Sequence, residues 1–191
     1  MSNARLLYLV LAVSGGFLAG LSLSEGFSLL MPFSLGFLWA STRFPLGGVI
    51  WGGVAVLVSH RWLLNLHPLG WLGIPSLLSL PISMSIWLFC GFFAALLVGC
   101  WSWFFNRFDR TEISTESFKR KTIYAIIFSL IWGLVEVVLA QGPLFLIGIG
   151  ASLLPGDRFL AGLARWIGAG GLASLQLFVG WWLWQLVINL N

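Results

Sequence analysis

The sequence has very little charge. Ten Lys or Arg and six Asp or Glu make up 8% of its 191 residues, whereas soluble domains carry about 25%. So few charges cannot cover a water-exposed surface of ordinary size, which excludes a soluble globular protein. Apolar runs take the place of charge, since hydrophobic residues are 59% of the chain and the mean hydropathy is +0.98. The composition therefore indicates an all-α polytopic membrane protein.

Cysteine and histidine are also scarce. Cys90 and Cys100 lie in one apolar run, where ten helical residues would separate them by about 15 Å, too far for a disulfide. Pro68 and its loop prevent His60 and His67 from lying on one helical face, and no Cys, Asp or Glu lies near them in the sequence. We therefore expect no metal site. The chain also has no phosphate-binding loop, no dinucleotide fingerprint and no serine with a base beside it in sequence, so we expect no cofactor and no catalytic residue.

The net charge of +4 does not indicate nucleic-acid binding. The basic residues lie at the ends of apolar runs and in the hydrophilic stretch 106–121. This placement is typical of membrane topology rather than of a binding stripe. We expect the stretch 106–121 to be a solvated turn that contacts anionic lipid.

Six apolar runs are separated by turns or polar residues, and we interpret the whole chain as one integral-membrane helical domain, 1–191. In the first and third runs, Gly16 with Gly20 and Gly48 with Gly52 have the spacing that allows close helix contact. Two apolar loops, 65–81 and 142–165, are expected in the membrane interface or re-entering it. The predicted spans are about 6–23, 27–42, 46–64, 82–105, 122–141 and 166–188.

The basic residues also predict the orientation. With the N-terminus in the cytoplasm, seven of the ten basic residues are cytoplasmic. The positive-inside rule therefore predicts N-in/C-in topology, with both apolar loops on the outer face. The three basic residues left outside are Arg61, Arg158 and Arg165; the seven inside are Arg5, Arg43, Arg107, Arg110, Lys119, Arg120 and Lys121.

One acid, Glu136, lies well inside the fifth predicted span. A charge there costs several kcal/mol unless it is paired, protonated or wetted. Arg61, near the outer end of the third span, is predicted at a similar depth, so we expect Glu136 to be neutralised by Arg61 or by His60 beside it. Trp132 should share its helix face. The sequence leaves both a structural and a functional role open for the candidate polar cluster, which comprises Glu136, Trp132, Arg61, His60, Trp62 and Gln141.

Several segments resemble bacterial apolipoprotein N-acyltransferase. The runs 132–136 (WGLVE) and 141–144 (QGPL) are similar to the fifth-span region of that family. Many members have an Arg three residues after the Glu, where this chain has Leu139. The other similar segments are the hairpin 16–40, Trp62 with the loop 69–75, the Pro-Gly turn at 155–156, the run 160–165 and the Gly-rich segment 168–171.

The resemblance implies a bacterial inner-membrane protein that acts in lipoprotein biosynthesis. Members of the family have eight spans and an outer nitrilase-like domain with a Glu-Lys-Cys triad, whose Cys passes an acyl chain from a phospholipid to the N-terminal amine of a diacylated lipoprotein. We expect this chain to correspond to the first six spans, without that domain. It would then be a fragment, a split gene product or a degenerate relative, not catalytic alone, and a separate nitrilase-like half would be a partner.

Two function hypotheses follow. In the first, the chain is the membrane part of such an acyltransferase and shapes the entry for phospholipid or lipoprotein acyl chains, near Trp132, Glu136 and the outer loops. In the alternative, it is the small-molecule capture component of a vitamin-type transporter, which would need a partner that hydrolyses ATP. A membrane scaffold is a third possibility.

Overall fold

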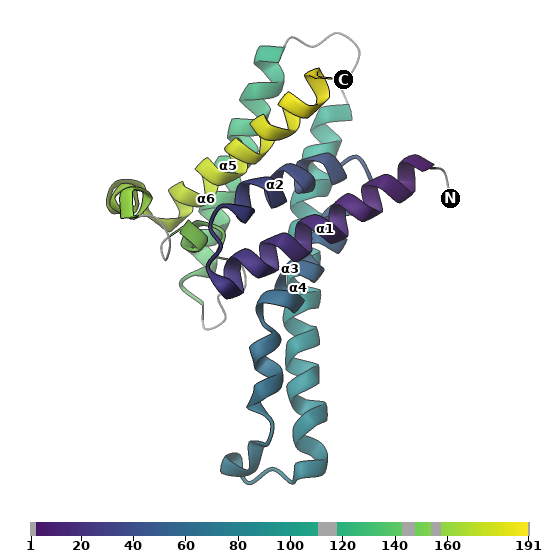
Figure 1. The fold of residues 1–191 in the computed structure, drawn as a ribbon, viewed down its shortest axis with the longest axis vertical. Helices are drawn as coiled ribbons and strands as arrows, with labels where there is room; N and C mark the ends of the chain where they lie inside the picture. The colour runs from purple at the N-terminus through teal and green to yellow at the C-terminus, as the bar shows by residue number, and fades with distance from the viewer. Residues whose placement is uncertain (1–2, 111–117, 143–147, 154–157, 191) are drawn as a thin grey trace.

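The computed structural model describes residues 3–110, 118–142, 148–153 and 158–190. Over these ranges the chain is helical and has no strand, which confirms the all-α prediction (Figure 1). Three short 3₁₀ helices lie in the connections: η1 (Arg61–Leu66), η2 (Leu69–Leu72) and η3 (Gly150–Leu153). The α-helices are α1 (Asn3–Glu25), α2 (Leu30–Ser41), α3 (Gly47–Ser59), α4 (Ser76–Arg110), α5 (Phe118–Leu139) and α6 (Arg158–Asn189).

Four of these helices, α1, α4, α5 and α6, are long and apolar enough to cross a bilayer. The other two are shorter, with 12 residues in α2 and 13 in α3. At 1.5 Å per residue, each covers only about 20 Å, less than the roughly 30 Å of hydrocarbon. Length and composition therefore support four spans directly.

The third predicted span, 46–64, is not one continuous α-helix, since α3 ends at Ser59 and η1 follows. The Ser59 hydroxyl donates to the Val56 carbonyl at 3.3 Å and lies 2.8 Å from Nδ1 of His60. Such local side-chain bonds compete with the regular helical ladder. The polar residues at the end of the run thus coincide with the change of helix type.

The predicted loop 65–81 is also shorter than expected, because α4 begins at Ser76 and contains Pro81. Pro81 is only the sixth residue of this helix. Only the first four N–H groups of a helix lack an internal partner, so Pro81 removes one hydrogen bond of the second turn, the one that would reach the Leu77 carbonyl. At its other end α4 runs to Arg110, past the predicted limit at 105.

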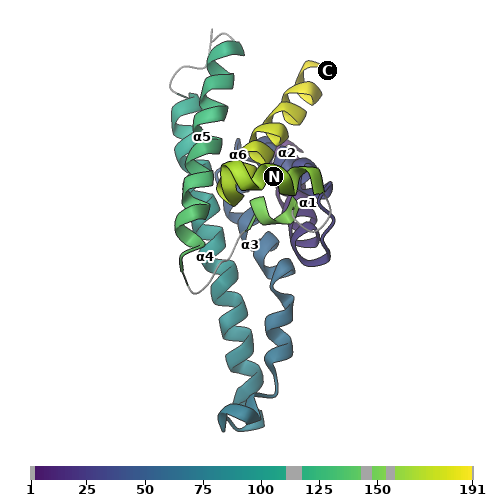
Figure 2. The ribbon, with the colours of Figure 1, turned by 90° about the vertical axis from the view of Figure 1, so that its left-hand side faces the viewer.

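Each α-helix packs mainly against one or two of the others, and glycines lie at several of these contacts. α3 packs against both α1 and α4, α2 packs against α1 and α6, and α5 packs against α6. A Cβ on Gly16 would lie 2.6 Å from the Trp51 carbonyl oxygen, and one on Gly52 would lie 2.7 Å from that of Ala94. The close contacts predicted from the glycine spacing are thereby confirmed. Below the other helices in Figures 1 and 2, the first part of α4 projects together with η1 and η2.

Aromatic rings fill the space between α2, α4 and α5. The Trp101 ring lies edge-on to Trp39 at 5.0 Å and to Trp132 at 6.0 Å between centroids. The indole N–H of Trp39 donates to the Leu177 carbonyl at 2.9 Å, and that of Trp101 to the Phe128 carbonyl at 3.1 Å. The core therefore holds these tryptophans by both packing and hydrogen bonds, which positions Trp132 beside Glu136.

α6 is two helical rods joined at Gly168, whose backbone is non-helical at φ 67° and ψ 179°. Only glycine adopts this region readily. The predicted short run 160–165 is helical and forms part of the first rod, and the predicted span 166–188 lies mostly in the second. The predicted outer loop 142–165 lies partly outside the described residues, and the Pro-Gly turn at 155–156 lies wholly outside them. Of the hydrophilic stretch 106–121, residues 111–117 are outside the described ranges, while residues up to Arg110 and from Phe118 on are helical.

Candidate functional site

Glu136 lies in the last turn of α5 and is 1% exposed. Its Oε1 accepts hydrogen bonds from the backbone N–H of Ile149 at 2.8 Å and from the indole N–H of Trp132 at 3.2 Å. Its Oε2 accepts from the N–H of Gly150 at 3.2 Å. The first N–H groups of a helix lack internal partners and favour negative charge, so this carboxylate caps the start of η3 from a distant helix.

The same short stretch is held from α6. The buried Gln176 side chain donates to the Ile149 carbonyl at 2.6 Å, and the Ser152 hydroxyl donates to it at 2.7 Å. Both polar backbone groups of Ile149 are therefore bound by side chains. A Cβ on Gly150 would collide with the backbone of Ala169. We call residues 148–152, together with Glu136 and Gln176, the clamp.

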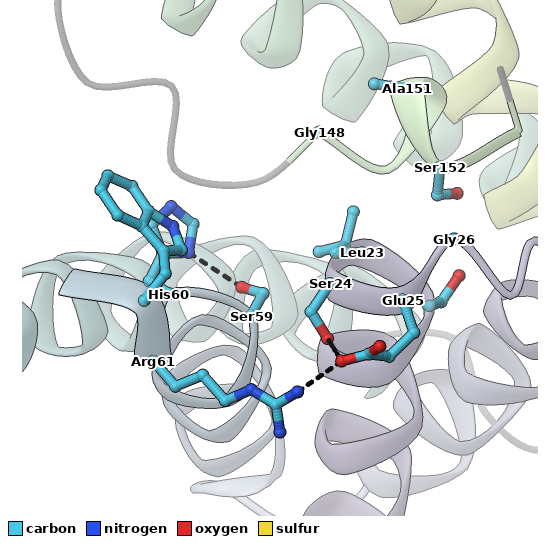
Figure 3. Close-up of a pocket in the computed structure, with 12 residues that line it drawn as sticks. Leu23, Ser24, Glu25, Gly26, Ser59, His60, Arg61, Gly148, Ala151 and Ser152 are labelled. Atoms are coloured by element: carbon cyan, nitrogen blue, oxygen red, sulfur yellow. Dashed lines mark hydrogen bonds and ion pairs between the residues drawn. The ribbon is translucent and has the colours of Figure 1, made fainter. Parts of the chain in front are cut away.

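The predicted pairing of Glu136 with Arg61 is wrong. Arg61 forms an ion pair with Glu25, at the end of α1, and the Ser24 hydroxyl also donates to Glu25 at 3.4 Å (Figure 3). Glu25 and Arg61 are both partly exposed, which suits two charges better than a buried position. Glu136 is instead satisfied by neutral donors, and the prediction that Trp132 shares its helix face is confirmed.

A cavity of about 510 Å³ lies between the ends of α1 and α3 and the clamp (Figure 3). The Ser22 hydroxyl on its wall is fully buried and is without a hydrogen-bond partner in the described part of the chain. We call it the outer cavity, after the side of the membrane that the sequence predicts for this end of the helices. Its lining residues are Ser22, Leu23, Ser24, Glu25, Gly26, Ser59, His60, Arg61, Trp62, Gly148, Ala151 and Ser152.

A second hollow of about 380 Å³ lies between α4 and α5, and we call it the α4–α5 groove. All of its side chains are apolar, aromatic or thiol. Trp132 is part of this wall and also donates to Glu136. The groove therefore ends against the clamp. Its lining residues are Leu97, Cys100, Trp101, Phe104, Phe108, Phe128, Ile131, Trp132 and Val135.

The structure divides the predicted polar cluster into two groups. Glu136 belongs to the clamp and Trp132 donates a hydrogen bond to it, whereas His60, Arg61 and Trp62 line the outer cavity. Residues 148–152 join the two groups, because they bind Glu136 through the backbone and form one wall of the cavity. Gln141 is exposed in the turn after α5 and lies outside both groups.

Two participants were missed from the sequence, Glu25 and Gln176. Glu25 is an acid at the same predicted depth as Arg61, so complementary charge at the outer ends of the first and third spans could have indicated their pairing. Gln176 is a polar residue in an otherwise apolar run, which inside a membrane predicts a hydrogen-bonded partner. Within the described ranges, no three His, Cys, Asp or Glu side chains are grouped so that they could hold a metal ion.

Known proteins are similar to this chain over almost all of its length, although no protein-family profile matches it. An apolipoprotein N-acyltransferase of Prochlorococcus marinus (strain MIT 9313) is 53% identical over 188 residues, which cover 98% of this chain and 38% of that protein. The enzyme of that name from Parasynechococcus marenigrum (strain WH8102) is 48% identical over 186 residues, covering 97% and 39%. The one from Gloeobacter violaceus is 30% identical over 162 residues, covering 71% and 30%.

The chain thus spans less than two fifths of the length of these relatives. The resemblance that its sequence motifs carried is confirmed by these identities. This chain is a homologue of the apolipoprotein N-acyltransferases over the part of their length that it spans.

Proposed function

We propose that this chain is the membrane-embedded part of an apolipoprotein N-acyltransferase-like protein and that it guides phospholipid acyl chains to the site of lipoprotein N-acylation. An acyl chain enters sideways from the bilayer into the α4–α5 groove and stops below the clamp. The six α-helices all lie in the bacterial inner membrane, with both ends of the chain in the cytoplasm. The short α2 and α3 then lie where α1, α4 and α6 cover them.

One observation carries this proposal: Trp132 lines the apolar groove and donates its indole N–H to Glu136. Each methylene moved from water into such a hollow gains about 0.8 kcal/mol, but a methylene in the bilayer is already out of water and has the same gain. The shape of the groove and its fixed end must therefore select the acyl chain. The clamp supplies that fixed end, because Glu136 and Gln176 hold residues 148–152 in place.

On this proposal the chain does not transfer acyl groups alone. A nitrilase-like half supplies the Glu-Lys-Cys triad, and a diacylated lipoprotein is the acceptor. The partner half then lies on the outer side, above the outer cavity and the clamp.

The test fills the groove and measures lipid entry. Ile131→Trp places an indole on the groove wall, whereas Leu130→Trp, one residue earlier on α5, adds the same group where it is 54% exposed and outside the lining. The chain is mixed with a separately expressed nitrilase-like half, and lipoprotein acylation is measured. In a second measurement, a phospholipid with a photoactivatable acyl chain is crosslinked to the chain alone.

We expect Ile131→Trp to lower both crosslinking at the groove and acylation at least severalfold, and Leu130→Trp to leave both near the unmodified level. Equal effects of the two substitutions, or crosslinks that avoid the groove residues, would contradict an acyl-chain route between α4 and α5.

The transporter alternative keeps one supporting observation, the outer cavity. Its volume of about 510 Å³ lies in the range of small-molecule sites, and Ser22 offers an unused hydroxyl there. Tight binding of a soluble vitamin by the purified chain, with no acylation in the mixing assay, would favour this function over the first.

A further inference from the structure

A third pocket lies at the opposite end of the helices from the outer cavity. It is formed where α2 ends, α5 begins and α6 ends, and its volume is about 290 Å³. We call it the inner pocket. Its lining residues are Trp39, Thr42, Arg43, Phe105, Phe118, Lys121, Tyr124, Trp181, Trp184, Gln185, Ile188 and Asn189.

The charge of the inner pocket has one sign. Arg43 lies in the turn after α2 and Lys121 lies in α5, and none of the described lining residues is acidic. The guanidinium of Arg43 lies 5.9 Å from the centre of the Trp184 ring, which orients it by a cation–π contact. Two cations that share a hollow repel each other, and an anion placed between them removes that repulsion.

The uncharged polar side chains also suit an anion with several oxygens. Tyr124, Gln185 and Asn189 line the pocket and carry hydroxyl or amide donors. Arg and Lys bind phosphate oxygens through charge-assisted hydrogen bonds. A phosphate group fits this donor set, because it accepts several hydrogen bonds at once.

The surroundings of the pocket indicate that the phosphate belongs to a lipid. Aromatic rings form its inner wall, and Phe118 and Trp182 stand beside it with 47% and 41% of their surfaces exposed. Trp and Tyr at helix ends are typical of the headgroup level of a bilayer. A soluble phosphate would use the cations but would leave these exposed rings uncovered.

We propose that the inner pocket binds the phosphate headgroup of an anionic phospholipid, with Arg43 and Lys121 contacting the phosphate and an acyl chain lying along Phe118 and Trp182. The site is separate from the α4–α5 groove, so it can be present even if acyl chains do not enter there.

The experiment measures lipid retention by the purified 191-residue chain. The chain in neutral detergent is mixed with phosphatidylglycerol or with phosphatidylcholine, and bound lipid is counted by native mass spectrometry. The test variant is Arg43→Gln with Lys121→Gln. The matched control is Lys119→Gln, which removes a cation from the same turn of α5 but lies outside the pocket lining. Inorganic phosphate alone is tested by its effect on the melting temperature.

We expect the unmodified chain and the Lys119→Gln control to retain phosphatidylglycerol over phosphatidylcholine. The double variant should lose roughly tenfold or more of that preference, given what a Lys or Arg contributes near an anionic surface. If the double variant does not fold, Lys121→Gln alone should lose severalfold. Equal retention of the two lipids, unchanged retention in the variants, or stabilisation by inorganic phosphate equal to that by phosphatidylglycerol would overturn the proposal.

Discussion

At the scale of single residues, a buried carboxylate loses its hydration and needs other partners. Glu136 has two backbone N–H groups and one indole N–H. The two backbone donors belong to residues 148–153, and in this described range the regular structure is one short 3₁₀ helix, η3. The carboxylate therefore replaces the hydrogen bonds that a longer helix or a sheet would have given this segment.

Removing the Glu136 side chain should therefore leave the N–H groups of Ile149 and Gly150 without their acceptor. Each buried donor left unsatisfied costs about 1–3 kcal/mol, so we expect Glu136→Ala to lower the free energy of unfolding by about 2–5 kcal/mol. Hydrogen exchange at the amides of Ile149 and Gly150 should accelerate with it. The control is Glu25→Ala, which removes a carboxylate from an exposed ion pair and should cost about 0–1 kcal/mol. Similar exchange rates in the two variants would show that Glu136 does not hold the segment.

The sequence predicted that Glu136 needs a partner and that Trp132 lies beside it, because both follow from helix geometry and the cost of buried charge. It could not predict the backbone donors of Ile149 and Gly150. Those depend on how a non-helical segment folds back, and neither periodicity nor composition records such a path. The choice of Arg61 failed for a related reason, since equal depth in the membrane does not mean the same side of the bundle.

At the scale of helices, α3 and α4 approach closely through Gly52 while its neighbour Gly53 has ordinary space. A Cβ on Gly53 would lie 3.4 Å from that of Ala95, whereas one on Gly52 would lie 2.7 Å from the Ala94 carbonyl oxygen and 2.8 Å from the Val98 Cβ. Predicting helix contact from the spacing of glycines thus worked, since small residues allow close approach in any membrane bundle.

This pair of glycines provides a matched test. Alanine gains about 1 kcal/mol of helix propensity over glycine at either position, but overpacking at Gly52 costs about 1–3 kcal/mol. We expect Gly53→Ala to match or exceed the stability of the unmodified chain and Gly52→Ala to fall below it. The midpoint of unfolding in a denaturing detergent would measure the difference. A Gly52→Ala chain as stable as Gly53→Ala would mean that α3 and α4 are not held this closely.

The bend in α6 gives a second test at this scale. Nothing lies within 4 Å of a Cβ on Gly168, so Gly168→Ala would meet no neighbour and would act through the backbone alone. Its positive φ should make the change cost about 1–3 kcal/mol. Gly162→Ala, also in open space but within a regular helical turn, should be neutral or slightly stabilising. The melting temperatures of the two variants would check this, and equal values would argue that the bend is not fixed by the backbone of Gly168.

At the scale of the whole molecule, the apolar runs predicted each of the six α-helices found in the described ranges, but the helix ends differed where hydropathy gives little information. α4 starts six residues before its predicted limit at 82, and α3 stops five residues before its predicted limit at 64. Hydropathy follows the solvent around a helix and not the hydrogen bonds that begin or end it. The end of α3 at Ser59 and the start of α4 at Ser76 therefore follow from neighbouring polar and proline residues.

The N-in/C-in orientation is testable with single cysteines. In a chain carrying Cys90→Ala and Cys100→Ser, Trp71→Cys places a thiol on η2, and Lys119→Cys places one at the start of α5. We expect a membrane-impermeant maleimide to label position 71 in intact cells and position 119 only after the membrane is opened, because the basic end of the bundle stays in the cytoplasm. Labelling in the reverse order would invert the orientation and the proposed location of both end pockets.

The early start of α4 makes this helix longer than the sequence predicted. The six additional residues 76–81 add about 9 Å of rigid helix, and η1 and η2 pack along its side (Figure 2). Exposed apolar side chains, among them Trp71 and Leu77, cover the tip that these helices form. If the function proposed above holds, these side chains would give an acyl chain a dry path toward the partner half.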